Sequence, residues 1–246
     1  MMFVINLNIR RISNEANKQN GSGLLVSKDR KMGGGVTSLA VLFFPVSALA
    51  VTYGVKNTDG NSEYSDGIVS GYDYGIFSNS STTKASLTTE NILINADKTG
   101  VYALTKGTAT VGASGITDGI SISVGSSDSP LKSNGYITQS TSGGTVNLSS
   151  NSATLSLYTT TSAYGIQTGS ASIGNHGSSY TNFSIDSLLN ITVSSLSGDA
   201  YAIRTQLTGI TDIQADNIQI IVSSDSDSKS AYGLKTMDRL QLSLSL

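Results

Sequence analysis

The chain of 246 residues contains no cysteine and no tryptophan, only two prolines and a single histidine. The lack of cysteine excludes disulfide scaffolds, thiol catalysis and cysteine-ligated metal sites. A single histidine likewise excludes metal sites that need two or more imidazole ligands. Exported bacterial surface proteins often lack cysteine, because an unpaired thiol is a hazard in an oxidising compartment.

Charge is sparse and is divided unevenly along the chain. Residues 1–50 hold six basic and two acidic side chains, whereas residues 51–246 hold nine basic and fifteen acidic ones. The second part is therefore mildly acidic and has no basic stripe that would displace counterions from phosphates. We expect it to have no nucleic-acid partner.

An apolar run over residues 36–50 follows a basic stretch at residues 28–31. The run ends in Ala48-Leu49-Ala50, the small-x-small pattern that a signal peptidase accepts. As a helix it would rise only about 22 Å, which is too short for a hydrocarbon core of about 30 Å. We therefore predict that residues 1–50 are an extended signal peptide, cut after Ala50, and that the remainder is exported to the periplasm, the cell surface or the medium. The alternative is a buried helix of a cytosolic protein.

A short phrase recurs through residues 51–246: a small residue, tyrosine, glycine or alanine, and then an aliphatic residue. The copies are unevenly spaced, and a degenerate one stands at Gly135-Tyr136-Ile137. We predict that the tyrosines of the full copies form a structural repeat: Tyr53, Tyr74, Tyr102, Tyr164, Tyr201 and Tyr232. The glycine permits either a positive φ or a close backbone approach, and alanine in two copies indicates that a positive φ is not obligatory.

The tyrosine series has two interpretations. An aromatic strip would stack on sugar rings, whereas a ladder of rings would hold one repeat against the next. Because alanine and glycine recur beside the tyrosines, the ladder is favoured.

A second phrase, Asn-Ile-x-(Ile/Val), begins at Asn91, Asn190 and Asn217. Apolar and polar residues alternate there, which is the period of a β-strand. We expect these residues to face the core: Ile92, Ile94, Ile191, Val193, Ile218 and Ile220. No stretch after residue 50 has helical spacing. Repeated modules made of short strands predict an all-β domain over residues 51–246, namely a right-handed parallel β-helix (β-solenoid) of about seven irregular coils.

A long basic leader followed by Ser-, Gly-, Asn- and Thr-rich Ala-Tyr-Gly-Ile repeats without cysteine resembles the passenger domain of autotransporters (type V secretion), the pertactin-like β-helices. The resemblance covers residues 51–246 through the style of the repeats. It implies an adhesin-like rod that binds a host surface glycan or protein. Members of that family end in a translocator barrel, for which no room remains here. We therefore expect a truncated passenger that meets a membrane only through the export signal or the missing barrel.

The last residues, 240–246, alternate like the middle of a strand. A solenoid needs a polar cap on its last coil, because an uncovered coil exposes backbone groups and an apolar cross-section. We therefore expect self-association through the open C-terminal coil.

Candidates for chemistry are few. His176 lies in a Gly- and Asn-containing turn, and residues 125–130 lack the order that a serine-protease motif requires. Asp59–Glu63 and Asp225–Asp227 place oxygen ligands at alternate positions, as calcium loops do, but Asp and Ser are also common turn formers and that interpretation is favoured. We assign no catalytic, cofactor-binding or metal-binding residue and predict that the chain is not an enzyme.

Two alternative functions stay open. One is a secreted β-helix enzyme that acts on polysaccharide through clustered carboxylates. The other is a structural fragment like a tailspike or coat protein. A reducing-sugar assay on polysaccharides distinguishes the enzyme from the other two functions.

Overall fold

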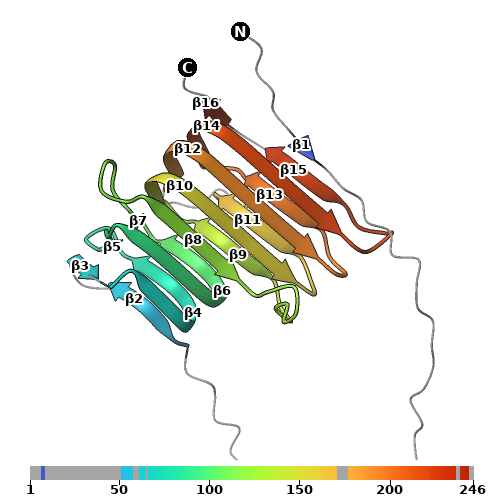
Figure 1. Ribbon diagram of the computed structural model, residues 1–246, viewed down its shortest axis with the longest axis horizontal. Helices are drawn as coiled ribbons and strands as arrows, with labels where there is room; N and C mark the ends of the chain where they lie inside the picture. The colour runs from blue at the N-terminus through green and yellow to red at the C-terminus, as the bar shows by residue number, and fades with distance from the viewer. Residues whose placement is uncertain are drawn as a thin grey trace, which may run out of the picture. The chain divides into compact units, whose positions relative to one another are not determined.

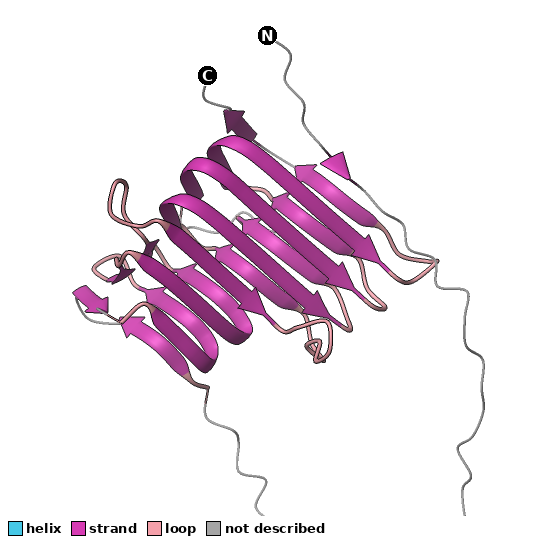
Figure 2. Ribbon diagram, in the orientation of Figure 1, coloured by secondary structure: helices cyan, strands magenta, loops and turns pink. Residues whose placement is uncertain are grey.

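The computed structural model describes residues 7–8, 51–57, 61–64, 66–170, 177–236 and 239–243. Every regular element in these ranges is a β-strand, and Figure 2 shows strands joined by loops. The prediction of an all-β domain is therefore confirmed. Within the same ranges no helix has the length and apolar character that a membrane span requires. Apart from Leu7–Asn8, the predicted leader lies outside the described residues.

Parallel pairing organises the strands into a stack of coils, as Figure 1 shows. In the described ranges every pairing is parallel, and strands of successive coils pair with one another. The strand at residues 7–8 is the exception, because it precedes the coils in the sequence and pairs with one of the last of them. Along the chain the strands visit three faces in a fixed order, which is the arrangement of a β-solenoid. We call these the tyrosine face, the third face and the serine face.

The strands divide among the faces as follows. The tyrosine face holds β2 (Tyr53–Asn57), the later parts of β4 (Ile68–Asn79) and β6 (Asn91–Leu104), β9 (Gly135–Ser140), β11 (Ala163–Thr168), β13 (Ala200–Thr205) and β15 (Ala231–Thr236). The third face holds β3 (Asn61–Tyr64), β5 (Lys84–Leu87), β7 (Thr108–Val111), the first parts of β10 (Thr145–Thr159), β12 (Ser179–Ser195) and β14 (Gly209–Ser224), and β16 (Arg239–Ser243). The serine face holds the first parts of β4 and β6, β8 (Gly119–Val124), the later parts of β10, β12 and β14, and β1 (Leu7–Asn8).

The core lies between the three faces, and alternation along each strand supplies it. In β8 the burial pattern alternates strictly, with Ile120, Ile122 and Val124 inside. Ile122 pairs in register with Ile94 on one side and Leu155 on the other, so branched side chains stack from coil to coil. Five of the predicted core residues are buried, and the sixth, Ile218, is partly buried against the same cluster.

Hydroxyl groups replace aliphatic side chains at one interior corner. Ser140, Thr168 and Thr205 come from the tyrosine face, whereas Thr181 and Thr211 come from the third face, and all five side chains are fully buried. The Oγ1 of Thr168 donates to Oγ1 of Thr181 at 2.8 Å and accepts from Oγ1 of Thr211 at 2.7 Å. The row of hydrogen bonds continues at both ends: Ser140 Oγ lies 3.0 Å from Thr181 Oγ1, and Thr205 Oγ1 lies 2.8 Å from Thr211 Oγ1. The burial of these hydroxyls is tolerated because each has a partner.

We expect Thr168→Val to destabilise the fold by about 1–3 kcal/mol, because it preserves shape while leaving Thr181 and Thr211 each without one partner. Thr205→Val is the matched control, because Thr205 lies at the end of this row of hydroxyl groups and its side chain shares a hydrogen bond with Thr211. Urea unfolding followed by circular dichroism measures both. Equal losses for the two variants would contradict the idea that the middle hydroxyl holds the network together.

Candidate functional site

The tyrosine face brings five of the six predicted tyrosines into one register position. Pairing aligns Tyr53 with Tyr74, and it also aligns Tyr164, Tyr201 and Tyr232. In the two coils between these groups, the same position holds Thr99 and Tyr136. The degenerate copy of the phrase therefore belongs to the series.

Tyr102, by contrast, lies three residues beyond the tyrosine position of its coil. It aligns with Phe77 and Gln139, and the equivalent residues of later coils include Arg204 and Lys235. The registers skip the residue after each tyrosine, so the strand carries an irregularity there. Because of it, two positions three residues apart both face outward.

The rings form two stacks. In the longer one, Tyr136, Tyr164, Tyr201 and Tyr232 follow each other at centroid distances of 5.1, 5.3 and 5.0 Å, with interplanar angles of at most 13°. In the shorter one, Tyr74 lies 5.4 Å from Tyr53 and 5.8 Å from Tyr102. The ring of Tyr102 thus supplies the aromatic contact that Thr99 does not.

Cations cover the rings of the longer stack. The guanidinium of Arg204 lies 5.1 Å from the ring centroids of both Tyr164 and Tyr201. Lys235 Nζ lies 5.1 Å from Tyr201 and 4.7 Å from Tyr232. Because neighbouring rings and cations cover these faces, the series supports packing of one coil on the next. Its stacked faces are not open to a sugar ring.

Tyr201 has the largest pKa shift of the tyrosines in the longer stack. Its burial, together with the nearby Asp199 carboxylate, raises the pKa of Tyr201 to about 12. The Tyr201 hydroxyl donates to Asp199 Oδ2 at 3.2 Å. The backbone N–H of Ser230 donates to Asp199 Oδ1 at 3.0 Å and lowers the pKa of that carboxyl. The pair therefore links the coil of β13 to the coil of β15.

We expect stability to fall as pH rises from about 10 to about 12. In that window an unfolded tyrosine, with its ordinary pKa of 10.0, loses the proton that folded Tyr201 keeps. Burial also raises the pKa values of Tyr102 and Tyr136, so Tyr201→Phe should weaken the alkaline loss without abolishing it. Urea midpoints across this pH range measure the effect. Tyr180→Phe, at an exposed position on the third face, is the control, and an unchanged slope for Tyr201→Phe would contradict the prediction.

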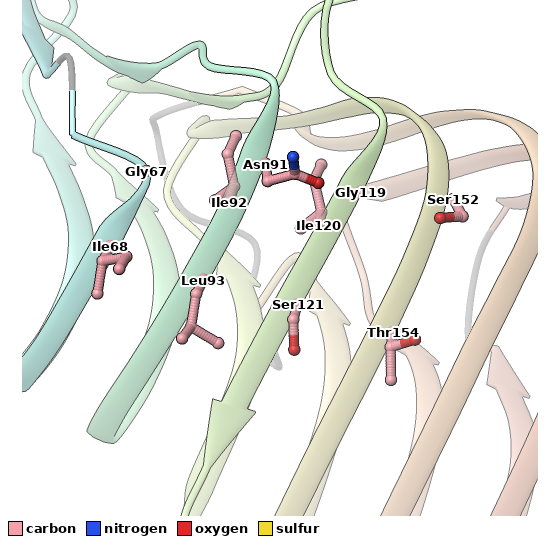
Figure 3. Close-up of a pocket in the computed structure, with 10 residues that line it drawn as sticks. All are labelled: Gly67, Ile68, Asn91, Ile92, Leu93, Gly119, Ile120, Ser121, Ser152 and Thr154. Carbon is pink, nitrogen blue, oxygen red and sulfur yellow. The ribbon is translucent and has the colours of Figure 1, made fainter.

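The serine face carries an open hollow of about 450 Å³ over its first coils. Figure 3 shows Ile68, Leu93, Ser121 and Thr154 side by side on successive strands, in the order in which they pair. Ile68 is 64% exposed and Leu93 is 37% exposed, so one end of this row is apolar. We call Ile68 and Leu93 the apolar ledge.

A second hollow of about 610 Å³ lies on the same face, two residues further along these strands. Its floor is a row of paired residues: Ser70, Asn95, Ser123 and Ser156. Asp97 and Tyr158 also line it, and four residues of one loop form its wall: Gly125, Ser126, Ser127 and Ser129. We call this hollow the serine groove. The sequence did not point to it, because its residues meet only when the register of four strands is known.

The wall of the serine groove is fixed to the coil that follows it. The backbone N–H of Leu131 donates to the Tyr158 carbonyl at 2.9 Å, and the N–H of Thr160 donates to the Leu131 carbonyl at 2.6 Å. Ser126 and Ser129 close a turn, since the N–H of Ser129 donates to Ser126 Oγ at 3.0 Å. The loop starts at Gly125, whose φ of +67° favours glycine.

The remaining chemical candidates do not converge on a site. His176 and residues 58–60 of the first proposed calcium loop lie outside the described residues. In the described part of the chain, no three His, Asp or Glu side chains gather as a metal site would require, and Asp225–Asp227 belongs to a turn after β14.

Comparison with protein-family models, with curated proteins and with solved structures finds no match to this chain.

Proposed function

We propose that this chain is exported and that residues 51–246 form an adhesin-like, right-handed β-solenoid, displayed at the bacterial surface or released, like the autotransporter passengers that it resembles. The observation that supports this proposal most is the stack of parallel coils, which presents long rows of Ser, Thr and Asn side chains to the solvent. Such a surface suits a rod that contacts a glycan or a protein outside the cell.

The serine groove favours binding over glycan hydrolysis. Glycosidases typically place two carboxyl groups about 5–10 Å apart on either side of the scissile bond. Asp97 is the single carboxylate among the described residues that line the groove. The lining therefore supports an adhesin-like role more than the alternative of a polysaccharide-degrading enzyme.

Expression of the full chain in a Gram-negative host tests the export proposal. We expect the processed protein to begin at Val51 and to be found in the periplasm, at the surface or in the medium. Ala50→Phe should block processing, because the peptidase needs a small residue there, whereas Leu49→Val should be processed normally. A cytosolic product, or one whose N-terminus precedes Val51, would show that the proposal is wrong.

Self-association is proposed at the outer edge of β14. In the full chain, Leu7 and Asn8 of β1 pair with Ile220 and Ile221 on that edge. Among the described strands, β1 is the one that covers this part of β14, so cleavage after Ala50 would uncover it next to Ile221, which is already 39% exposed. An open strand edge with apolar neighbours pairs readily with another chain. Analytical ultracentrifugation of the processed protein should show association that Ile221→Lys reduces.

A further inference from the structure

We propose that the serine groove, together with the apolar ledge, binds a short neutral oligosaccharide. This inference rests on the proposed function, because such a ligand would be met outside the cell. It names the chemistry that the surface recognises and the residues that recognise it.

The floor of the groove suits a ligand with many hydroxyl groups. Ser123 Oγ and Ser156 Oγ share one hydrogen bond at 2.9 Å, which uses one of their two donors and leaves the other, with several lone pairs, for a ligand. The amide of Asn95, on the next strand, offers both a donor and an acceptor. Neighbouring strands repeat at about 4.8 Å, so the polar groups form a regular lattice along which hydroxyls of a sugar ring can bond.

The charge of the groove excludes other ligand classes. Asp97 is exposed, and among the described residues that line the groove it is the one carboxylate and there is no lysine or arginine. A carboxylate accepts hydrogen bonds strongly from hydroxyl groups, and it repels phosphate and other anions. A single carboxylate does not supply the six to eight oxygen ligands of a calcium site. A neutral polyol is the ligand that these groups fit.

Tyr158 and the apolar ledge add nonpolar contact. Tyr158 is half-buried at the end of the floor and belongs to neither tyrosine stack. Ile68 and Leu93 lie two residues before Ser70 and Asn95 on the same two strands, so all four side chains face the same side of the sheet. The C–H faces of a second sugar unit would pack on this ledge while the first unit occupies the groove. The ligand is therefore longer than a monosaccharide.

The loop 125–131 is held before any ligand arrives. Its hydrogen bonds to Tyr158 and Thr160 fix the wall, and the Cβ of any other residue at Gly125 would lie 2.5 Å from the Tyr158 carbonyl oxygen. A wall that is already ordered lowers the entropic cost of binding. This matters for a shallow groove, which buries little of its ligand.

Titration of the purified full chain with neutral oligosaccharides of glucose, galactose and mannose, on an array and then by calorimetry, tests the proposal. Sialylated and sulfated oligosaccharides serve as anionic comparators. We expect a neutral ligand to bind, and we expect Asp97→Asn and Tyr158→Ala each to weaken it about tenfold or more. Asp186→Asn and Tyr180→Ala are the matched controls, because both residues are exposed on β12, outside the groove.

Each outcome decides the matter. Binding that is lost in Asp97→Asn, with an unchanged circular dichroism spectrum, supports the groove even if Tyr158→Ala fails to fold. Binding of anionic sugars alone, of no sugar, or with equal affinity in Asp97→Asn and the parent overturns it. A chain that stays in the cytosol yet binds a neutral sugar through Asp97 would refute the export proposal and support sugar binding by the serine groove. An exported chain that binds none of these sugars would support export and refute sugar binding.

Discussion

Replacement of Ile191 by aspartate is expected to unfold the coils around β12. Ile191 is 1% exposed, and it stacks between Leu155 and Ile220 in the interior. The change removes a buried aliphatic side chain, which alone costs about 2–5 kcal/mol, and it places a charge between two apolar side chains of the core. Domains are stable by only about 5–15 kcal/mol in total, so the loss consumes most of the stability. Circular dichroism and urea unfolding measure it.

Thr192→Asp is the matched control, because Thr192 is the next residue of the same strand and points to the outer side. A carboxylate there meets water, and we expect a change of about 0.5 kcal/mol or less. A variant Ile191→Asp that keeps its strand signal and its urea midpoint would show that the alternation of β12 is assigned to the wrong faces. Coils contact mainly their neighbours, so partial unfolding confined to the middle of the stack agrees with the prediction.

The alternation of polar and apolar residues was enough to predict the strand content and most of the interior. Within a regular stretch of strand, a residue's face depends on whether its position is odd or even, so an alignment error of two residues leaves the face unchanged. The phrase at Asn190, for example, is two residues out of register with the phrases at Asn91 and Asn217: Asn217 pairs with Leu188, whereas Asn190 pairs with Gln219. Because the shift is even, Ile191 still faces the core.

A shift of three residues, in contrast, misplaces a side chain. Tyr102 matched the phrase as well as the other copies did, but its coil places Thr99 at the tyrosine position. Thr99-Gly100-Val101 has the glycine and the aliphatic residue of the repeated phrase and lacks only its tyrosine. The glycine and the aliphatic residue therefore predict the register of this coil better than the tyrosine does. The serine groove could not be predicted from the sequence for a related reason. It combines residues from four strands and a loop, and sequence spacing alone does not fix which of them are neighbours.

The glycine of the repeated phrase had two possible roles, and the structure distinguishes them. Gly75, Gly100 and Gly165 are absent from the residues with positive φ, so backbone conformation does not require glycine there. A Cβ at Gly100 would instead lie 2.7 Å from the Ile137 carbonyl oxygen and 2.4 Å from Cγ2 of Ile122. The requirement is a close approach of the next coil.

Gly100→Ala is therefore expected to destabilise the fold by about 3 kcal/mol, the upper part of the range for overpacked interiors. The backbone of the following coil is fixed by its own pairing, so the carbonyl of Ile137 cannot move aside without breaking the ladder between β6 and β9. Gly119→Ala is the matched control, because the nearest atom to its Cβ would be Asn91 Oδ1 at 3.5 Å, an ordinary contact. It should be neutral or slightly stabilising, since alanine restricts the unfolded chain. Urea midpoints of the two variants compare them directly, and a Gly100→Ala midpoint equal to that of Gly119→Ala would show that the coils can separate to admit a methyl group.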